Sequence, residues 1–289
     1  MRGVVCMEDK MNFVYRAIEL LLPFSWISYD FMKNALIAIL IITPLFGILG
    51  TMIVNNRMAF FSDALGHSAL TGMAVGIVLG IMDTNISMVL FAVVFALILN
   101  KIKRRKTVST DTIISVFSSL STALGLVILS RGGNFSKYSS LLVGDILSIT
   151  PKEIVLLLLV FIVTLIFWGI GFNKLHAISI NETLAKSKNI NAIGIDNVFV
   201  VIIALIVMLS IKWVGILIIN ALLILPAASS RNIAANMREY HLFSVIISLF
   251  SGITGLILSY YNSTATGPTI VIIAAIIFFL TLLVKPKIK

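Results

Sequence analysis

One short stretch of the chain contains an acid, an imidazole and a hydroxyl side chain at regular intervals. Asp63, His67 and Thr71 are spaced four residues apart, so on a helix they fall on one stripe. A carboxylate and an imidazole on adjacent turns can bind one divalent cation together. An ionised side chain at the centre of a membrane helix costs about 3 kcal/mol, so it should face a bundle interior or water. The spacing predicts a cation site; the alternative is that Asp63 and His67 only hold a bundle together.

A second group of polar features surrounds a proline. Pro226 removes one backbone donor and frees the carbonyl of Leu222, which predicts a kink in its helix. Asn220 and Ser229 flank this kink and can line a polar path with the freed carbonyl, although such a kink can also serve packing alone. Asp145 lies in a separate polar segment, where it either faces the same path or caps a helix near the surface.

A polar loop at 173–195 contains a short stretch that can form a helix. The stretch carries Glu182 and Ala185 and is expected to stop at Gly194. Composition alone is typical of a solvated linker.

The composition decides which elements must position these residues. Hydrophobic residues make up 59% of the 289 residues and charged residues 12%, and the mean hydropathy is +1.10. These values exclude a soluble globular protein and a disordered chain. The net charge of +10 comes from basic residues in short loops between apolar runs, which indicates membrane topology and not nucleic-acid binding. No ATP-binding glycine loop or zinc-protease motif is present, so any energy source must be a partner or a gradient.

The sequence predicts an all-α, polytopic membrane protein with eight to ten transmembrane helices. A span needs about 20 apolar residues, and nine segments approach that length: 34–54, 58–80, 86–100, 112–130, 153–172, 196–211, 214–232, 242–260 and 267–284. The count varies because 86–100 is short and 196–232 can split at Lys212 or contain a re-entrant piece. Phe135–Thr150 is too polar to span and too apolar for a free loop, so we expect a re-entrant half-helix there. Residues 1–29 are expected to be an interfacial segment and 30–289 a single transmembrane domain.

Basic residues predict the orientation. Placing the run from Lys101 to Lys106 in the cytoplasm sends Arg57, the 173–195 loop and the C-terminal lysines to the same side. With nine spans the N-terminus is then outside and the C-terminus inside.

Four motifs in order resemble the membrane permease of the zinc and manganese class of ABC importers, over nearly the whole chain from Asp30. They are RMAFFSDALGHSALTG (57–72), LVGDILSITP (142–151), KWVGILIINALLILPAASSR (212–231) and YYNSTATGPT (260–269). The chain departs from this family at Ser229, where threonine is frequent, and in lacking a proline near Thr264 or Ala265.

The resemblance implies that 30–289 is a permease domain, a transport subunit without a permanently bound cofactor, in the cytoplasmic membrane of a prokaryote. It implies that Asp63 and His67 lie on the ion path and that 180–194 is a coupling helix docking on a separate ATPase. The expected partners are this ATPase, an extracellular metal-binding protein and a second permease copy.

Zinc is the favoured cargo, because a histidine ligand suits zinc while manganese sites lean toward oxygen ligands. A manganese or iron permease of the same family and a proton-coupled secondary transporter stay as alternatives.

Overall fold

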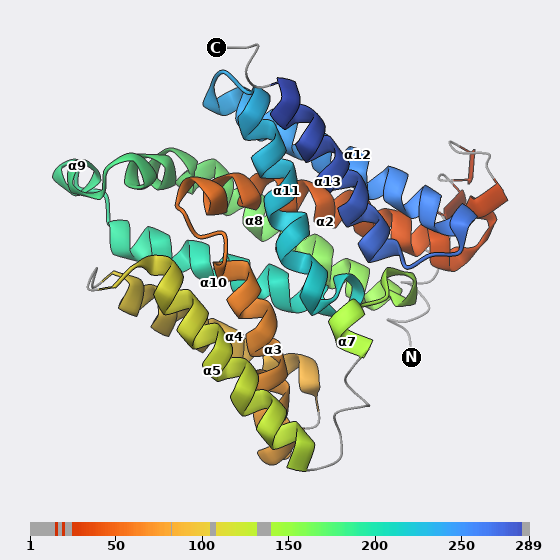
Figure 1. The fold of residues 1–289 in the computed structure, drawn as a ribbon, viewed down its shortest axis with the longest axis horizontal. Helices are drawn as coiled ribbons and strands as arrows, with labels where there is room; N and C mark the ends of the chain where they lie inside the picture. The colour runs from red at the N-terminus through yellow and green to blue at the C-terminus, as the bar shows by residue number, and fades with distance from the viewer. Residues whose placement is uncertain are drawn as a thin grey trace.

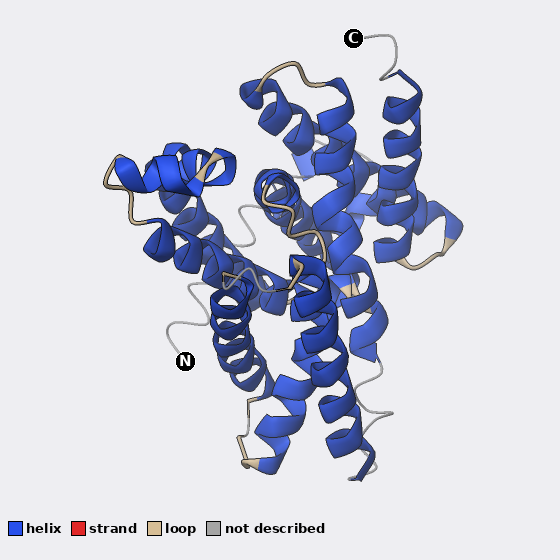
Figure 2. Ribbon diagram, turned by 60° about the vertical axis from the view of Figure 1, so that its left-hand side comes forward, coloured by secondary structure: helices blue, strands red, loops and turns tan. Residues whose placement is uncertain are grey.

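The computed structural model describes residues 15–16, 19–20, 25–81, 83–104, 108–131 and 140–284. All secondary structure in these ranges is helical, as Figure 2 shows, which confirms the all-α class. Nine helices in the described ranges have 18 or more residues: α2 (Asp30–Asn55), α3 (Phe61–Val78), α4 (Thr84–Lys103), α5 (Thr110–Arg131), α8 (Pro151–Ile180), α10 (Ala192–Val214), α11 (Ile216–Ile233), α12 (Met237–Asn262) and α13 (Thr266–Val284).

Seven of these nine helices are long and apolar enough to cross a membrane, which supports a polytopic membrane protein. The other two are α3, which carries Asp63 and His67, and α11, whose stretch Ile218–Ile233 is apolar but shorter than a span. Most residues of α3 are buried inside the protein, which is where a membrane helix with ionisable side chains is expected to lie.

The helices form two groups on either side of a central layer (Figure 1). Helices α3, α4 and α5 pack together at one end, and α11, α12 and α13 pack together at the other. Between them lie α2, α8 and α10, and both α10 and α11 also contact α3. The group that holds Asp63 and His67 is thus attached to the rest of the bundle mainly through α10 and α11.

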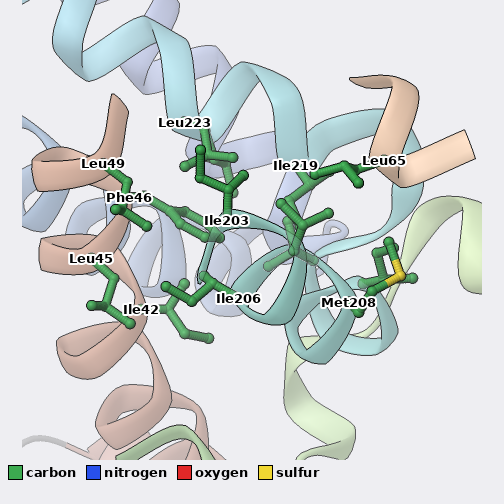
Figure 3. Packing of buried hydrophobic residues seen from close by; sticks show 14 of the residues in the cluster. Ile42, Leu45, Phe46, Leu49, Leu65, Ile203, Ile206, Met208, Ile219 and Leu223 are labelled. Carbon is green, nitrogen blue, oxygen red and sulfur yellow. The ribbon is translucent and has the colours of Figure 1, made fainter. Parts of the chain in front are cut away.

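The core lies where α2, α3, α10 and α11 meet. Figure 3 shows Phe46 and Leu49 of α2 facing Ile203 of α10 and Leu223 of α11, and all four side chains are at most 1% exposed. Helices α2 and α11 approach closely because α2 has Gly50 there: a Cβ at that position would lie 2.0 Å from the carbonyl oxygen of Leu223. Small residues at such contacts let membrane helices pack backbone to backbone.

Two helix boundaries differ from those expected. Helix α8 does not end at 172 but runs to Ile180, because nothing between these positions breaks a helix and a membrane surface does not end one. The break between α10 and α11 lies at Gly215 and not at Lys212, since Gly215 adopts a φ of 91° that a residue with a side chain would strain to reach. The loop expected at 173–195 therefore shrinks to the residues around the short helix α9 (Glu182–Ser187).

The segment expected to form a half-helix is only partly described. Residues 135–139 lie outside the described ranges, and the remainder forms two single turns, α7 (Ser140–Val143) and η2 (Ile146–Ser148), instead of one continuous half-helix. Gly144 separates them with a φ of 70°. A Cβ on Gly144 would lie 2.3 Å from the backbone nitrogen of Gly215, and a Cβ on Gly215 would lie 2.3 Å from the carbonyl oxygen of Val143. The two bends therefore touch backbone to backbone.

The end of the predicted interfacial segment joins the core. Short helix η1 (Ser25–Ser28) buries Trp26 and Ile27 to 3% and 2% exposure. Farther upstream, the Tyr15 hydroxyl donates to the Asn34 side chain at 2.5 Å, and Lys33 pairs with Glu19 at 2.5 Å. The described parts of this segment thus contact the start of α2, while most of 1–24 lies outside the described ranges.

Candidate functional site

Asp63 and His67 line one open pocket of about 590 Å³ between α3 and α5. The acid comes from the first turn of α3 and the imidazole from the next turn, as the spacing predicted. The rest of the lining consists of Phe60 and residues of α5: Ile114, Ser115, Ser118, Ser119, Thr122, Ala123 and Leu126. The pocket therefore joins a charged wall on α3 to a wall on α5 that carries hydroxyl groups.

The acid and the imidazole are near each other without being hydrogen-bonded. His67 Nε2 lies 3.8 Å from Asp63 Oδ1, beyond hydrogen-bond distance, and the side chains are 27% and 37% exposed. The other ring nitrogen, Nδ1, is buried and has no hydrogen-bond partner among the described residues. No hydrogen bond therefore occupies Nε2 or ties the two groups together, and both remain available to a ligand in the pocket.

Asp63 and His67 are two possible ligands, fewer than a closed metal site needs. Within the part of the chain that the structure describes, no group of three or more His, Cys, Asp or Glu side chains could hold a metal ion. Divalent zinc takes four ligands, so two protein ligands leave the remaining positions to water or to another chain. Such a site binds a cation less tightly than a closed four-ligand site does.

Thr71, the third residue of the predicted stripe, lies outside this pocket lining. Its side chain is buried and donates to the carbonyl oxygen of Ser121, whose hydroxyl in turn donates to Thr71 Oγ1 at 3.0 Å. Gly125 allows the close approach, since a Cβ there would lie 2.8 Å from the Thr71 nitrogen. Thr71 therefore fixes α3 against α5 one turn beyond His67.

Asn220 lies next to the pocket through a single contact. Its side-chain oxygen accepts a hydrogen bond from Ser62, the neighbour of Asp63 in sequence. This bond connects α11 to the start of α3 and places Asn220 behind the charged wall. The sequence placed Asn220 on a polar path, and the structure brings it close to Asp63 without making it part of the lining.

Ser229 and Pro226 lie farther along α11. Ser229 is fully buried and donates to the carbonyl of Leu225 at 2.7 Å, within its own helix. Pro226 lies inside α11, which continues past it to Ile233. Neither residue lines the pocket, and a role for them on an ion path stays a prediction.

Asp145 caps a short helix. Its carboxylate accepts from the backbone nitrogen of Leu147 at 3.0 Å, and its own backbone nitrogen donates to the carbonyl of Lys212. The residue is exposed and lies outside the pocket lining. Of the two roles that the sequence left open for Asp145, the geometry shows the cap.

The predicted coupling stretch folds onto the end of α4. Arg104 donates to the Glu182 carboxylate at 3.4 Å and to Asp196 at 2.7 Å, and so connects α4 to α9 and α10. Ala185 is buried at 2% exposure, facing the protein and not a partner. Gly194 is not the expected helix stop, because it lies in the first turn of α10 and donates to its cap, Asn191, at 2.9 Å.

Two sets of residues escaped the sequence argument. The hydroxyls at 115, 118, 119 and 122 follow the i, i+3, i+4 and i+7 pattern of one helix face, so their spacing could have revealed them. Arg104 was counted only as part of a basic run that sets orientation. Its acidic partners are far away in sequence, so no local signal pointed to the pairing.

Comparisons with known proteins identify the family to which the chain belongs. The model of the ABC 3 transport family matches residues 28–285. The high-affinity zinc uptake system membrane protein ZnuB of Buchnera aphidicola subsp. Baizongia pistaciae is 30% identical over 249 residues, which cover 85% of this chain and 94% of that protein. The manganese import system permease protein ScaB of Streptococcus gordonii is 27% identical over 260 residues, covering 90% and 93%.

A solved structure extends the likeness to three dimensions. It is that of PsaBC from Streptococcus pneumoniae in complex with a Fab, which has a TM-score of 0.79 and 26% identity and covers 96% of this chain and 97% of that one. The family model covers almost the whole described bundle, including the pocket and α9. This chain therefore belongs to the ABC 3 transport family.

Proposed function

We propose that the chain moves a divalent metal ion, with zinc preferred, along a path that passes Asp63 and His67. The open pocket between α3 and α5 carries this proposal, because it leaves a carboxylate and an imidazole accessible to a ligand inside a polytopic membrane protein. Ionisable residues in membrane segments are functional sites by default. As a member of an ABC transport family the chain is a transport subunit and not an enzyme, and ATP hydrolysis belongs to a separate subunit.

The second copy of the permease completes the site in this proposal. Two chains related by a two-fold axis, with their α3–α5 pockets facing, would offer two carboxylates and two imidazoles to one ion. The partly exposed side chains of Asp63 and His67 support this arrangement, as does the lack of a third ligand among the described residues of one chain. Alternating access would then open the shared path first to one side of the membrane and then to the other.

The topology that we propose has nine spans, with the N-terminus outside. Helices α3 and α11 count as spans because they are packed inside the bundle, which shields their polar residues from lipid. The segment at 140–150 re-enters from the outer side in the cytoplasmic membrane of a prokaryote. Its support is the burial of Ile146 and Ile149 at 5% and 3% exposure.

The partners act at opposite ends of the bundle. We infer that α9 docks on the ATPase, because it is a short helix at a loop whose side carries the basic residues expected in the cytoplasm. An extracellular metal-binding protein would deliver the ion at the other end. The secondary-transporter alternative loses its support, since the family that the chain belongs to is one of ABC transport.

Two observations favour zinc over manganese, one from a ligand residue of this chain and one from a related protein. His67 supplies the nitrogen ligand that zinc favours, and the ZnuB relative named for zinc uptake is slightly more similar than the ScaB relative named for manganese. Manganese is the second candidate, and ScaB is the observation in its favour. Growth of a deletion strain under zinc chelation, compared with growth under manganese starvation, tests the choice. Rescue by added manganese but not by zinc would overturn it.

A further inference from the structure

The wall of the pocket opposite Asp63 and His67 carries a row of hydroxyl groups. Ser115, Ser118, Ser119 and Thr122 of α5 all line the pocket. They occupy successive turns on one face of the helix and span about 10 Å from the first to the last at about 1.5 Å per residue. We call these four residues the hydroxyl face.

These hydroxyls differ from most others in the membrane helices. Ser68, Thr164 and Ser251, for example, donate back to a carbonyl three or four residues earlier in their own helix, which is how a hydroxyl is usually satisfied in an apolar environment. Within the described residues, no hydrogen bond joins the hydroxyls of Ser115, Ser118 or Ser119 to another group. Of the four, Thr122 alone donates back, to the backbone carbonyl of Ser118 at 2.8 Å. The hydroxyls of Ser115, Ser118 and Ser119 are therefore free to bind something in the pocket.

A second surface of α5 is apolar. Val116 and Leu120 are 58% and 55% exposed, and each directly follows a serine of the hydroxyl face. Helix α5 thus exposes two different surfaces, one apolar and one carrying unpaired hydroxyls. Unpaired hydroxyls facing lipid would be costly, so their side of the helix needs water or a polar ligand.

The contact between α3 and α5 fixes where the hydroxyl face begins. Thr71 bonds Ser121, and both helices run in the same direction (Figure 1). Counting back four and eight residues along both helices places His67 level with about 117 and Asp63 with about 113. The hydroxyl face starts between these two levels and continues about one turn past His67 to Thr122, toward the C-terminal end of α5. It therefore leads away from the charged pair in one direction.

We propose that the hydroxyl face is a track that binds a hydrated divalent cation and leads it to Asp63 and His67. This inference rests on the proposed transport function. A neutral hydroxyl accepts hydrogen bonds from the water shell of a cation and can replace single waters, but it carries no charge that would trap the ion. In the topology proposed above, the C-terminal end of α5 is the outer end, so the track is the entry side of the path.

Water accessibility tests the surface directly. In a Cys6→Ser background, Ser115→Cys and Ser119→Cys should react with a cationic, membrane-impermeant methanethiosulfonate in cells that express the complete transporter. The neighbouring Val116→Cys and Leu120→Cys are the matched controls and should react little, because their side faces lipid. Reaction at 116 and 120 but not at 115 and 119 would overturn the proposal.

Transport tests the role of the hydroxyl groups themselves. The combined Ser115→Ala, Ser118→Ala and Ser119→Ala variant should lower the initial rate of Zn²⁺ or Mn²⁺ uptake by about tenfold, since it removes two or three hydrogen bonds to the hydrated ion. The triple serine-to-threonine variant keeps the hydroxyls and should recover most of the rate. Ser130→Ala, which removes an exposed hydroxyl of α5 outside the pocket, is the control and should leave uptake unchanged.

The two proposals fail in different ways. Wild-type uptake by the triple alanine variant, while Asp63→Ala still abolishes uptake, would reject the track and keep the ion path at the charged pair. Normal uptake by Asp63→Ala would instead reject the proposed function. A triple alanine variant that loses uptake and is not recovered by threonine would also reject the track, because the loss would then not depend on the hydroxyl.

Discussion

The molecule contains two clusters of ionisable side chains, one open to a pocket and one closed within the protein. Asp63 and His67 lie 3.8 Å apart in an open pocket, whereas Arg104 contacts Asp196 at 2.7 Å with side chains that are 20% and 11% exposed. The first cluster leaves its charges without hydrogen bonds to each other, and the second satisfies them internally. Charged groups inside this bundle can thus serve a ligand or serve the fold, and the distance and exposure of the pair distinguish the two uses.

The two clusters are also connected. Arg104 ends α4 and bonds α9 and α10, while the hydroxyl of Ser87, near the other end of α4, donates to the carbonyl of Gly72 in α3. Helix α4 therefore links the closed cluster beside α9 to the helix that carries the open cluster.

The largest expected effect is at the open cluster. Asp63→Ala and His67→Ala should each reduce metal uptake by more than about 100-fold, since losing a ligand exceeds the effect of losing an outer partner. The melting temperature and assembly with the ATPase should stay close to wild type, because neither side chain holds the fold together. Uptake of ⁶⁵Zn²⁺ and thermal unfolding of the purified permease measure the two quantities. If both variants unfold at a lower temperature while the protein that stays folded takes up metal normally, the Asp63–His67 cluster stabilises the fold as the Arg104–Asp196 cluster does.

The closed cluster should respond in the opposite way. Arg104→Ala leaves the Asp196 side chain, which is 11% exposed, with Lys103 at 4.0 Å as its remaining basic partner among the described residues, and should cost about 2 kcal/mol of unfolding free energy. Adding Asp196→Asn should recover part of this loss, because the buried charge is then gone. Arg131→Ala, at the exposed end of α5, is the control. A melting temperature unchanged by Arg104→Ala would contradict the comparison.

Thr71 lies on the same helix as the open cluster, but like the closed cluster it is hydrogen-bonded within the protein. Thr71→Val removes the hydroxyl that connects α3 to α5 and should lower stability by about 1 kcal/mol. The uptake rate per folded molecule should change little, since Thr71 lies outside the pocket lining. A loss of uptake at full stability would move Thr71 onto the ion path, where the sequence first placed it.

The smallest effect is expected on the surface of α9. Thr183→Arg changes an exposed side chain of this helix and should weaken capture of the ATPase by about five- to tenfold, in the range of one interface contact. The stability of the permease should not change. Ala185→Trp makes the useful contrast, because this buried position should lose stability before it affects docking. Equal capture by the Thr183→Arg and wild-type proteins would leave α9 as a solvated linker.

Hydropathy predicted the long helices well, because a long apolar run is costly to expose to water and has the length that a bilayer core requires. Each of the nine expected segments overlaps one long helix, and Asp63 and His67 were placed together from their spacing alone. The pairing of Arg104 with Asp196 and Glu182 could not be predicted, since it depends on how α4 approaches α9 and α10. The contact of Thr71 was missed for the same reason. Its four-residue spacing puts it on the same helix face as Asp63 and His67, but the packing of α3 against α5 makes Ser121 its partner.

Helix ends were the weaker part of the prediction. Hydropathy marks where a chain leaves the apolar layer, and α8 continues eight residues beyond that point. The sequence predicted the break between α10 and α11 at Lys212, because a charged residue is expected to end an apolar segment. The break lies three residues later, at Gly215. A positive φ, and not a charge, decides where this chain turns.

The contact between Gly144 and Gly215 has a consequence for how this sequence can change over time. Each glycine occupies a backbone conformation that excludes most residues, and each would also strike the backbone beside the other if it gained a side chain. No single substitution at either position relieves the collision at its partner, so the two sites behave as one unit under selection. Descendants of this chain can diverge around the joint, but they must retain both glycines or rebuild both bends together.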